Sequence, residues 1–355
     1  MSRLNLEHQR KRARALLNSV RLRDAEALGR VSRAGAGDAE AVALHDAQLV
    51  IARENGFSSW SKLKAHIRSE GLERPLMLAA RLMAANRAVE TTRRDPLYRD
   101  PFAHELAGDD GWAAWHAVRQ ASWPGYASGP DPFLTILTRF FDDALVSAVK
   151  KAAITQVVIV GAGMDTRAFR LEWPSDVRLF EVDTADVFAQ KERVLNRLGA
   201  QPRCQRETIV ANHHGSLKRA LRRTAFDPAR PTAFLIERIQ YLRPDSADRL
   251  LRELTTLASE GSWIGLALIS AETLRSSFMQ PFLHKLEAAG MPPWRFGMDD
   301  PEAWLSTHGW NASSLVAGAP DASYGRWPYG YIPRGTPAIP RGFFTSGWKT
   351  REEHP

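Results

Sequence analysis

The stretch Thr155-Gln-Val-Val-Ile-Val-Gly-Ala-Gly-Met-Asp-Thr-Arg167 decides how the rest of the chain is arranged. Residues 157–160 are β-branched and uncharged, which predicts a strand buried on both faces of a parallel sheet. Gly161 and Gly163 follow at once, where they permit a tight turn and let a ligand approach the backbone closely. The stretch therefore predicts the first strand and the ligand-binding loop of an α/β fold.

A second apolar run, residues 177–183, ends in a carboxylate. Asp183 lies 20 residues beyond Gly163, where a doubly wound nucleotide site places an acidic side chain on the ribose hydroxyls. Thr166 stands where the dinucleotide fingerprint has its third glycine, so a pyrophosphate close to the helix is disfavoured. S-adenosylmethionine (SAM) carries no phosphate, and the pattern therefore favours SAM over NAD.

Strand-like and helix-like segments alternate regularly after this point. Further strands are predicted at residues 207–211, 232–236 and 263–269, with helical segments between them and one helix at residues 273–289 after the last. This alternation implies a doubly wound parallel sheet with right-handed crossovers, whose ligand edge lies at the carboxyl ends of the strands. Asp183, Asn212 and Glu237 all fall at that edge.

Composition narrows the class of protein. A chain of 355 residues with 44% hydrophobic content can bury a large core. The single cysteine, Cys204, excludes an internal disulfide and a cysteine-cluster metal site, and no metal ligands occur at recognisable spacing. No apolar run approaches a membrane span and no signal-peptide pattern opens the chain, so we expect a cytoplasmic protein with no membrane partner.

The net charge of +8 raises the question of nucleic acid. The basic side chains are mostly arginines scattered through predicted helices, without the dense clusters and interleaved aromatic residues of a nucleic-acid groove. The sequence therefore predicts no nucleic-acid partner.

Two domains are expected. Residues 1–70 read as short helices with 13 basic and 8 acidic side chains, which places most of the excess charge in a small N-terminal helical module. A junction at residues 71–75 starts a new helix and the main domain, residues 75–355. Within that domain, residues 75–150 form a helical cap and lead-in, and residues 151–355 form the sheet core. The N-terminal module is either a docking or homodimerisation unit or a helical appendage that packs on the main domain.

Aromatic residues gather in two further places. One stretch, residues 108–131, has no clear period and holds Trp112 and Trp115; the other holds Trp327, Tyr329 and Tyr331. Such side chains can stack on a flat, ring-containing substrate, although a satellite core explains the first stretch equally well.

From about residue 75 onward, the chain resembles the leucine-carboxyl-methyltransferase-like family of class I SAM-dependent methyltransferases, in its bacterial small-molecule branch. The order and spacing of several motifs over about 270 residues carry this resemblance. They are Arg87-Ala-Val-Glu90, Asp100-Pro-Phe-Ala103, Thr138-Arg-Phe-Phe-Asp-Asp143, Gly161-Ala-Gly-Met-Asp-Thr-Arg167, Glu181-Val-Asp183, Phe226-Asp-Pro-Ala-Arg-Pro231, and Glu237 with Tyr241-Leu242.

The resemblance implies a mostly parallel, seven-stranded Rossmann-like sheet with one reversed strand, which we expect near residues 342–345. It also implies a cofactor site for SAM. In that site Arg87 and Arg139 hold the SAM carboxylate, Gly161, Ala162 and Gly163 pass under the methionyl part, Asp183 binds the ribose, Asn212 lies at the adenine edge, and Glu237 closes the floor.

Three departures from the family pattern bear on this site. The usual Asp-Leu pair at the adenine edge is replaced at residues 212–213 by Asn-His, and the usual Arg-Thr at residues 137–138 by Leu-Thr. The customary small and apolar residues after Glu237 are replaced at residues 238–240 by Arg-Ile-Gln. Each change is compatible either with drift on a working site or with a retuned pocket.

The expected activity is SAM-dependent methylation of a carboxylate or hydroxyl oxygen on a small metabolite, such as an aromatic or polyketide-type product of secondary metabolism. A carboxylate acceptor needs no base, whereas a hydroxyl does, and His213 or His214 is the candidate. The alternative is a SAM-sensing regulatory protein in which the N-terminal module recruits a partner.

Overall fold

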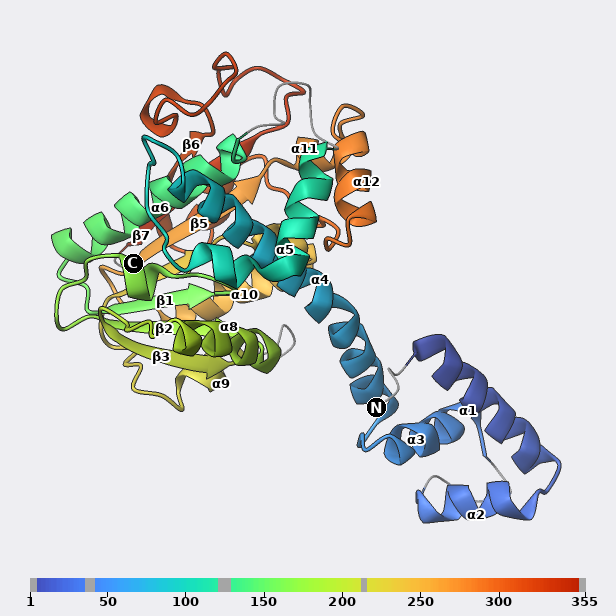
Figure 1. The fold of residues 1–355 in the computed structure, drawn as a ribbon. Coiled ribbons are helices and arrows are strands. Elements are labelled where there is room, and N and C mark those ends of the chain that lie inside the picture. Colours follow the sequence, from blue (N-terminus) through green and yellow to red (C-terminus); the bar gives the residue numbers. More distant parts are fainter. Residues whose placement is uncertain (1–4, 36–41, 121–128, 212–215, 351–355) are drawn as a thin grey trace. The chain divides into compact units, whose positions relative to one another are not determined.

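The computed structural model describes residues 5–35, 42–120, 129–211 and 216–350, with the backbone alone at residues 65–73 and 120 (Figure 1). The chain forms two compact units, Met1–Arg74 and Pro75–Pro355. We describe each unit by itself.

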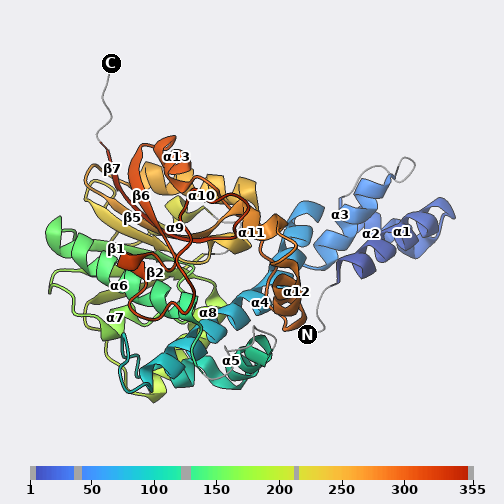
Figure 2. The same cartoon turned by 90° about the horizontal axis from the view of Figure 1, so that it is seen from above.

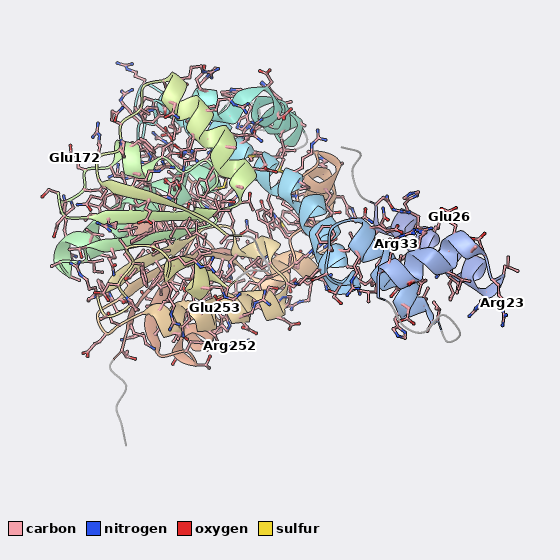
Figure 3. All side chains as sticks on the ribbon, turned by 90° about the horizontal axis from the view of Figure 1, so that it is seen from below. Arg23, Glu26, Arg33, Glu172, Arg252 and Glu253 are labelled. Atoms are coloured by element: carbon pink, nitrogen blue, oxygen red, sulfur yellow. The ribbon has the colours of Figure 1, made fainter. Side chains whose placement is uncertain are left out.

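The first unit is helical and has a core of its own. It contains α1 (Leu6–Arg21), α2 (Ala25–Arg33), α3 (Leu44–Glu54) and the start of α4 (Trp60–Thr91). The side chains of Asn5 and Asp24 cap the first two helices by accepting hydrogen bonds from backbone amides three residues ahead. Apolar residues from all four helices form one buried cluster that includes Leu16, Val31, Ile51 and Leu63. Charged side chains such as Arg23, Glu26 and Arg33 surround these helices (Figure 3).

The helix α4 does not begin where the sequence predicted. We expected a new helix at the 71–75 junction, but α4 runs continuously from Trp60 to Thr91 with Pro75 inside it. A proline in a helix removes one main-chain donor, and the helical pattern on both sides overrides that local loss.

The second unit is built on a seven-stranded sheet. Its strands run in the order β3-β2-β1-β4-β5-β7-β6. The first five in sequence are parallel, and β7 is antiparallel to both of its neighbours. The strands are β1 (Gln156–Val160), β2 (Arg178–Asp183), β3 (Gln205–Val210), β4 (Thr232–Ile236), β5 (Trp263–Ile269), β6 (Trp310–Val316) and β7 (Gly342–Lys349). The prediction of a mostly parallel sheet with a reversed strand near residues 342–345 is confirmed.

Helices cover both faces of this sheet (Figures 1 and 2). Alternate residues of β1 point to opposite sides: Val157 and Ile159 join one core cluster and Val158 joins the other. The first cluster holds residues of α4, α5 (Ala103–Gln120), α6 (Pro132–Lys151), α7 (Arg167–Arg170) and α8 (Ala185–Arg197). The second holds residues of α9 (Leu217–Leu221), α10 (Pro244–Leu257) and α13 (Pro301–Ser306). The apolar run without polar alternation in β1 is thus explained by burial on both faces.

Two segments differ from the sequence expectation in detail. The aromatic stretch that showed no period is helical as far as Gln120, with a kink at Gly108, where φ is 57°. There Trp112 and Trp115 pack edge to face at 5.9 Å, so these rings contact each other as a satellite of the core. The segment after β5 forms two short helices, α11 (Ala271–Arg275) and α12 (Gln280–Ala288), separated by an extended Ser276.

Three-residue 3-10 helices, η1 (Ile239–Tyr241) and η2 (Pro320–Ala322), complete the elements. Within the described residues, no helix has both the length and the apolar character needed to cross a membrane.

Candidate cofactor site

The loop after β1 turns sharply at two glycines. Gly161 and Gly163 adopt φ angles of 67° and 51°, which side chains disfavour. The amides of Gly161 and Ala162 both donate to the carbonyl of Val182, at 2.8 and 3.0 Å. The amide of Gly163 donates to Oδ2 of Asp183 at 2.7 Å. The loop and the carboxylate at the end of β2 are therefore fixed to each other.

A second reason for glycine at position 163 is the approach of α4. A Cβ atom on Gly163 would lie 2.8 Å from Cβ of Ala80 and 3.0 Å from Nη2 of Arg238. The first of these distances is far below a van der Waals contact, so the residue must remain without a side chain. The loop is thus closed in by α4 on one side and by Arg238 on the other.

Arg238 occupies the centre of the site. Its Nε and Nη2 atoms donate to the carbonyl oxygen of Gly161 at 3.0 and 2.6 Å, and Nη2 also donates to Oδ2 of Asp183 at 2.9 Å. Its Nη1 atom donates to the carbonyl of Leu76 on α4 at 3.1 Å. The side chain is only 11% exposed. One guanidinium therefore links the glycine loop, the β2 carboxylate and α4.

The cavity beside Arg238 is small. Its free space is about 20 Å³, which is room for about one water molecule and far less than SAM requires. The described lining comes from α4, β1, the glycine loop and the end of β4, and consists of Ala80, Met83, Arg87, Ile159, Val160, Gly161, Ala162, Met164, Asp165, Glu237 and Arg238.

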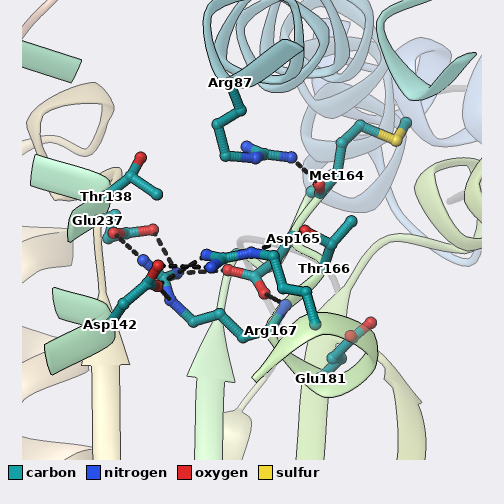
Figure 4. Close-up of polar contacts among 12 residues, drawn as sticks. Arg87, Thr138, Asp142, Met164, Asp165, Thr166, Arg167, Glu181 and Glu237 are labelled. Carbon is teal, nitrogen blue, oxygen red and sulfur yellow. Dashed lines mark hydrogen bonds and ion pairs between the residues drawn. The ribbon is translucent and has the colours of Figure 1, made fainter. Parts of the chain in front are cut away.

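The floor of the cavity is held by a buried arginine (Figure 4). Arg167 donates through Nη1 and Nη2 to the two oxygens of Glu237 at 3.0 and 2.8 Å, and through Nε to Asp142 at 2.8 Å. It also pairs with Asp165 at 2.5 Å. Burial alone would raise the pKa of Asp165, but the charges of Arg167 and Lys191 lower it to about 2. Both oxygens of Glu237 thus accept hydrogen bonds from Arg167.

The two arginines predicted to hold the SAM carboxylate lie in different surroundings. Arg87 lines the cavity, where its Nε donates to Asp100 at 2.8 Å and its Nη2 donates to the carbonyl of Met164 (Figure 4). Arg139 is absent from the cavity lining and donates instead to Asp143 at 2.7 Å and to the carbonyl of Leu97 at 2.6 Å. The structure therefore brings Arg87 to the site and leaves Arg139 outside it, and both roles toward the cofactor stay predictions.

Three predicted residues, Asn212, His213 and His214, lie outside the described residues. The sequence did not predict that Arg238 lines the cavity. The signal was present, since an arginine replaces the small residue that usually follows the glutamate. In the part of the chain that the structure describes, no three His, Cys, Asp or Glu side chains gather as metal ligands.

The polar groups present fit the chemistry of SAM. The α-ammonium group and ribose hydroxyls of SAM are hydrogen-bond donors, and the carbonyl of Gly161 and the carboxylate of Asp183 are acceptors. The glycine loop supplies backbone that a ligand can approach closely. The guanidinium of Arg238 lies between these groups and is hydrogen-bonded to both of them.

The strand order, the reversed strand and the glycine loop with its β2 carboxylate define a class I SAM-dependent methyltransferase. Comparison with known proteins identifies the family within this class. The sequence model of the leucine carboxyl methyltransferase family matches residues 80–255, and the chain belongs to this family.

Two curated relatives are described as putative SAM-dependent methyltransferases. The protein from Streptomyces avermitilis is 35% identical over 260 residues, covering 69% of this chain and 86% of the relative. The protein from Frankia alni is 36% identical over 256 residues, covering 69% and 85%. A crystal structure of a DUF574 family protein from Streptomyces avermitilis has a TM-score of 0.47 and 14% identity, covering 77% of this chain and 97% of that one.

Proposed function

We propose that this protein transfers the methyl group of SAM to an oxygen atom of a small metabolite, with a carboxylate as the preferred acceptor. The observation that supports it most is the match of residues 80–255 to the leucine carboxyl methyltransferase family, because this range includes every described residue that lines the cavity. The family name indicates a carboxylate acceptor.

The cavity lining also suits a carboxylate. The described residues around the cavity include no histidine, so none of them offers an imidazole as a general base. A carboxylate acceptor is already ionised above a pKa of about 4 and needs no base, whereas a phenol with a pKa near about 10 must lose a proton.

SAM supplies an activated sulfonium methyl group, and the protein then has to align the acceptor oxygen with it. In this assignment the loop of Gly161 and Gly163 lies along the methionyl part, and Asp183 accepts hydrogen bonds from the ribose. Glu237 stays paired with Arg167 and keeps the floor rigid. Rate acceleration comes mainly from proximity and from exclusion of water.

A hydroxyl acceptor is the second candidate, favoured by His213 and His214, which follow Val210 at the end of β3 by three and four residues in the sequence. Tyr329 and Tyr331 are each nearly half exposed and so leave ring surface on which a flat acceptor that bears such a group can stack.

An acceptor screen separates these chemistries. The full chain is incubated with SAM and with panels of carboxylic acids and phenols, and products one methyl group heavier are sought by mass spectrometry. An ester that mild alkali hydrolyses supports the carboxylate, and an alkali-stable ether whose formation is lost in His213→Ala or His214→Ala supports the hydroxyl. SAM binding without turnover of any acceptor would instead favour a SAM-sensing protein.

A further inference from the structure

The position of Arg238 at the end of β4 creates a conflict inside the cofactor site. Its guanidinium donates to the carbonyl of Gly161 and to the carboxylate of Asp183. These are the two acceptors that the site offers to the ammonium and hydroxyl donors of SAM. The protein therefore satisfies, with its own side chain, the same acceptors that the cofactor needs.

Other acceptors near the cavity also have partners within the protein. Glu237 has both oxygens bound to Arg167, which is itself fully buried and also paired with Asp142. The second oxygen of Asp183 accepts from the backbone amide of Thr184 at 2.7 Å. Competition thus concentrates on the carbonyl of Gly161 and on Oδ2 of Asp183.

Charge adds to the competition. SAM carries a sulfonium, an ammonium and a carboxylate group, and a guanidinium bound to Gly161 and Asp183 lies at the acceptors for the ammonium and hydroxyl donors, where it repels the two cationic centres. Arg238 is the group that can move, because its guanidinium stands at the end of a long side chain with several rotatable bonds, whereas the carbonyl of Gly161 belongs to the backbone.

We infer that Arg238 is an internal competitor of SAM: it occupies the acceptors of the cofactor site, and the cofactor binds only when this side chain is displaced. Apparent affinity is then reduced by the fraction of molecules in which the site is open. Arg238 is a residue that sets cofactor affinity, and the reaction chemistry does not require it. This inference rests on SAM as the cofactor and not on the nature of the acceptor.

Calorimetry on the full chain tests the inference. Arg238→Ala removes the side chain, and Arg238→Met keeps its length without donors or charge. Both variants should bind SAM, and its demethylated product, at least about tenfold more tightly than the native chain, equivalent to about 1.4 kcal/mol. Arg243→Ala is the matched control, because Arg243 is exposed, lies five residues further on and makes no side-chain cap at α10.

Thermal unfolding, measured on the same samples, establishes that each variant is folded. Unchanged or weaker binding in folded Arg238→Met would overturn the inference, since it would mean that Arg238 does not compete or that it helps to hold the cofactor. Tighter binding in Arg238→Ala alone would overturn the competition for acceptors and leave a purely steric effect. Loss of SAM binding in both variants would also overturn the inference. These binding results do not depend on the acceptor screen, because calorimetry needs no acceptor.

Discussion

Asp183 accepts three hydrogen bonds within the protein, from the amides of Gly163 and Thr184 and from Arg238. Its carboxylate therefore fixes the loop, and we predict that it also receives the ribose. A buried carboxylate held by several donors is costly to remove, because each charged hydrogen bond contributes about 1.5–3 kcal/mol. The consequences of changing it should appear in cofactor binding and in folding stability together.

We predict that Asp183→Ala weakens SAM binding by at least about tenfold, because paired hydrogen bonds to the ribose are lost. Calorimetry measures the effect, and Asp186→Ala serves as control because Asp186 is exposed in the first turn of α8. Native affinity in a folded Asp183→Ala variant would remove Asp183 from the cofactor site.

Asp183 and Arg238, which are hydrogen-bonded to each other, differ in how well the sequence predicted their positions. Asp183 was predictable because a strand end and a fixed spacing after Gly163 define its backbone position. The reach of Arg238 was not, because a long side chain takes its direction from partners far away in sequence, such as the carbonyl of Leu76. Arg139 shows the same limit, since its motif matched while its guanidinium contacts Asp143.

At the scale of elements, α4 comes close to the loop after β1. Gly163→Ala would place a Cβ 2.8 Å from Cβ of Ala80 at a φ of 51°. Gly199→Ala is the matched control, since Gly199 has a φ of 63° and open space around it. We expect Gly199→Ala to cost about 1–2 kcal/mol for the left-handed backbone, and Gly163→Ala about 1–3 kcal/mol more for overpacking.

The measurement is the free energy of unfolding from urea titrations of both glycine variants. Equal losses would show that backbone conformation alone explains the glycine at position 163 and that α4 does not restrict the loop.

The buried ion pairs around Arg167 join α6, the glycine loop and the end of β4. The folded-state pKa of Asp165 is about 2, since the charges of Arg167 and Lys191 outweigh the burial that raises it. An unfolded aspartate has a pKa of about 3.9, so this group stabilises the fold above that pH and loses its contribution as pH falls toward about 2.

We therefore predict that Asp165→Asn lowers the free energy of unfolding at pH 7 by about 2 kcal/mol, and that the difference from the native chain shrinks below about pH 4. Urea titrations at pH 7, 5 and 3.5 measure it. A difference that stays constant over this range would show that Asp165 is not ionised at a lowered pKa.

The positions of strands and helices were predicted well within a continuous apolar pattern, and less well at the residues where such a pattern ends. The runs that form β1, β4 and β5 are mainly apolar because both faces of the sheet are covered, so their bounds were visible in sequence. The ends of helices depend on tertiary contacts, which the sequence pattern does not show. The helix α4 therefore continues across the expected junction, and the segment after β5 forms two helices where one was expected.

At the scale of the whole molecule, the question is whether the sheet unit needs the N-terminal unit. The core of the first unit draws on residues from Ala13 to Leu63, and the three core clusters of the second begin at Met77. The described residues of the cofactor cavity all lie beyond residue 75. Each unit thus has separate buried clusters, which is the physical requirement for folding alone.

We predict that a chain of residues 75–355 unfolds cooperatively and binds SAM within about threefold of the full chain, because a separate core gives independent stability. Thermal unfolding followed by circular dichroism tests the first statement and calorimetry the second, with the full chain as reference. The cut removes the first part of α4 but keeps Leu76 and Ala80, which contact Arg238 and the glycine loop. Non-cooperative unfolding would show that the first unit completes the main core. Cooperative unfolding with lost SAM binding would instead show that the first turns of α4 position the residues that close over the loop.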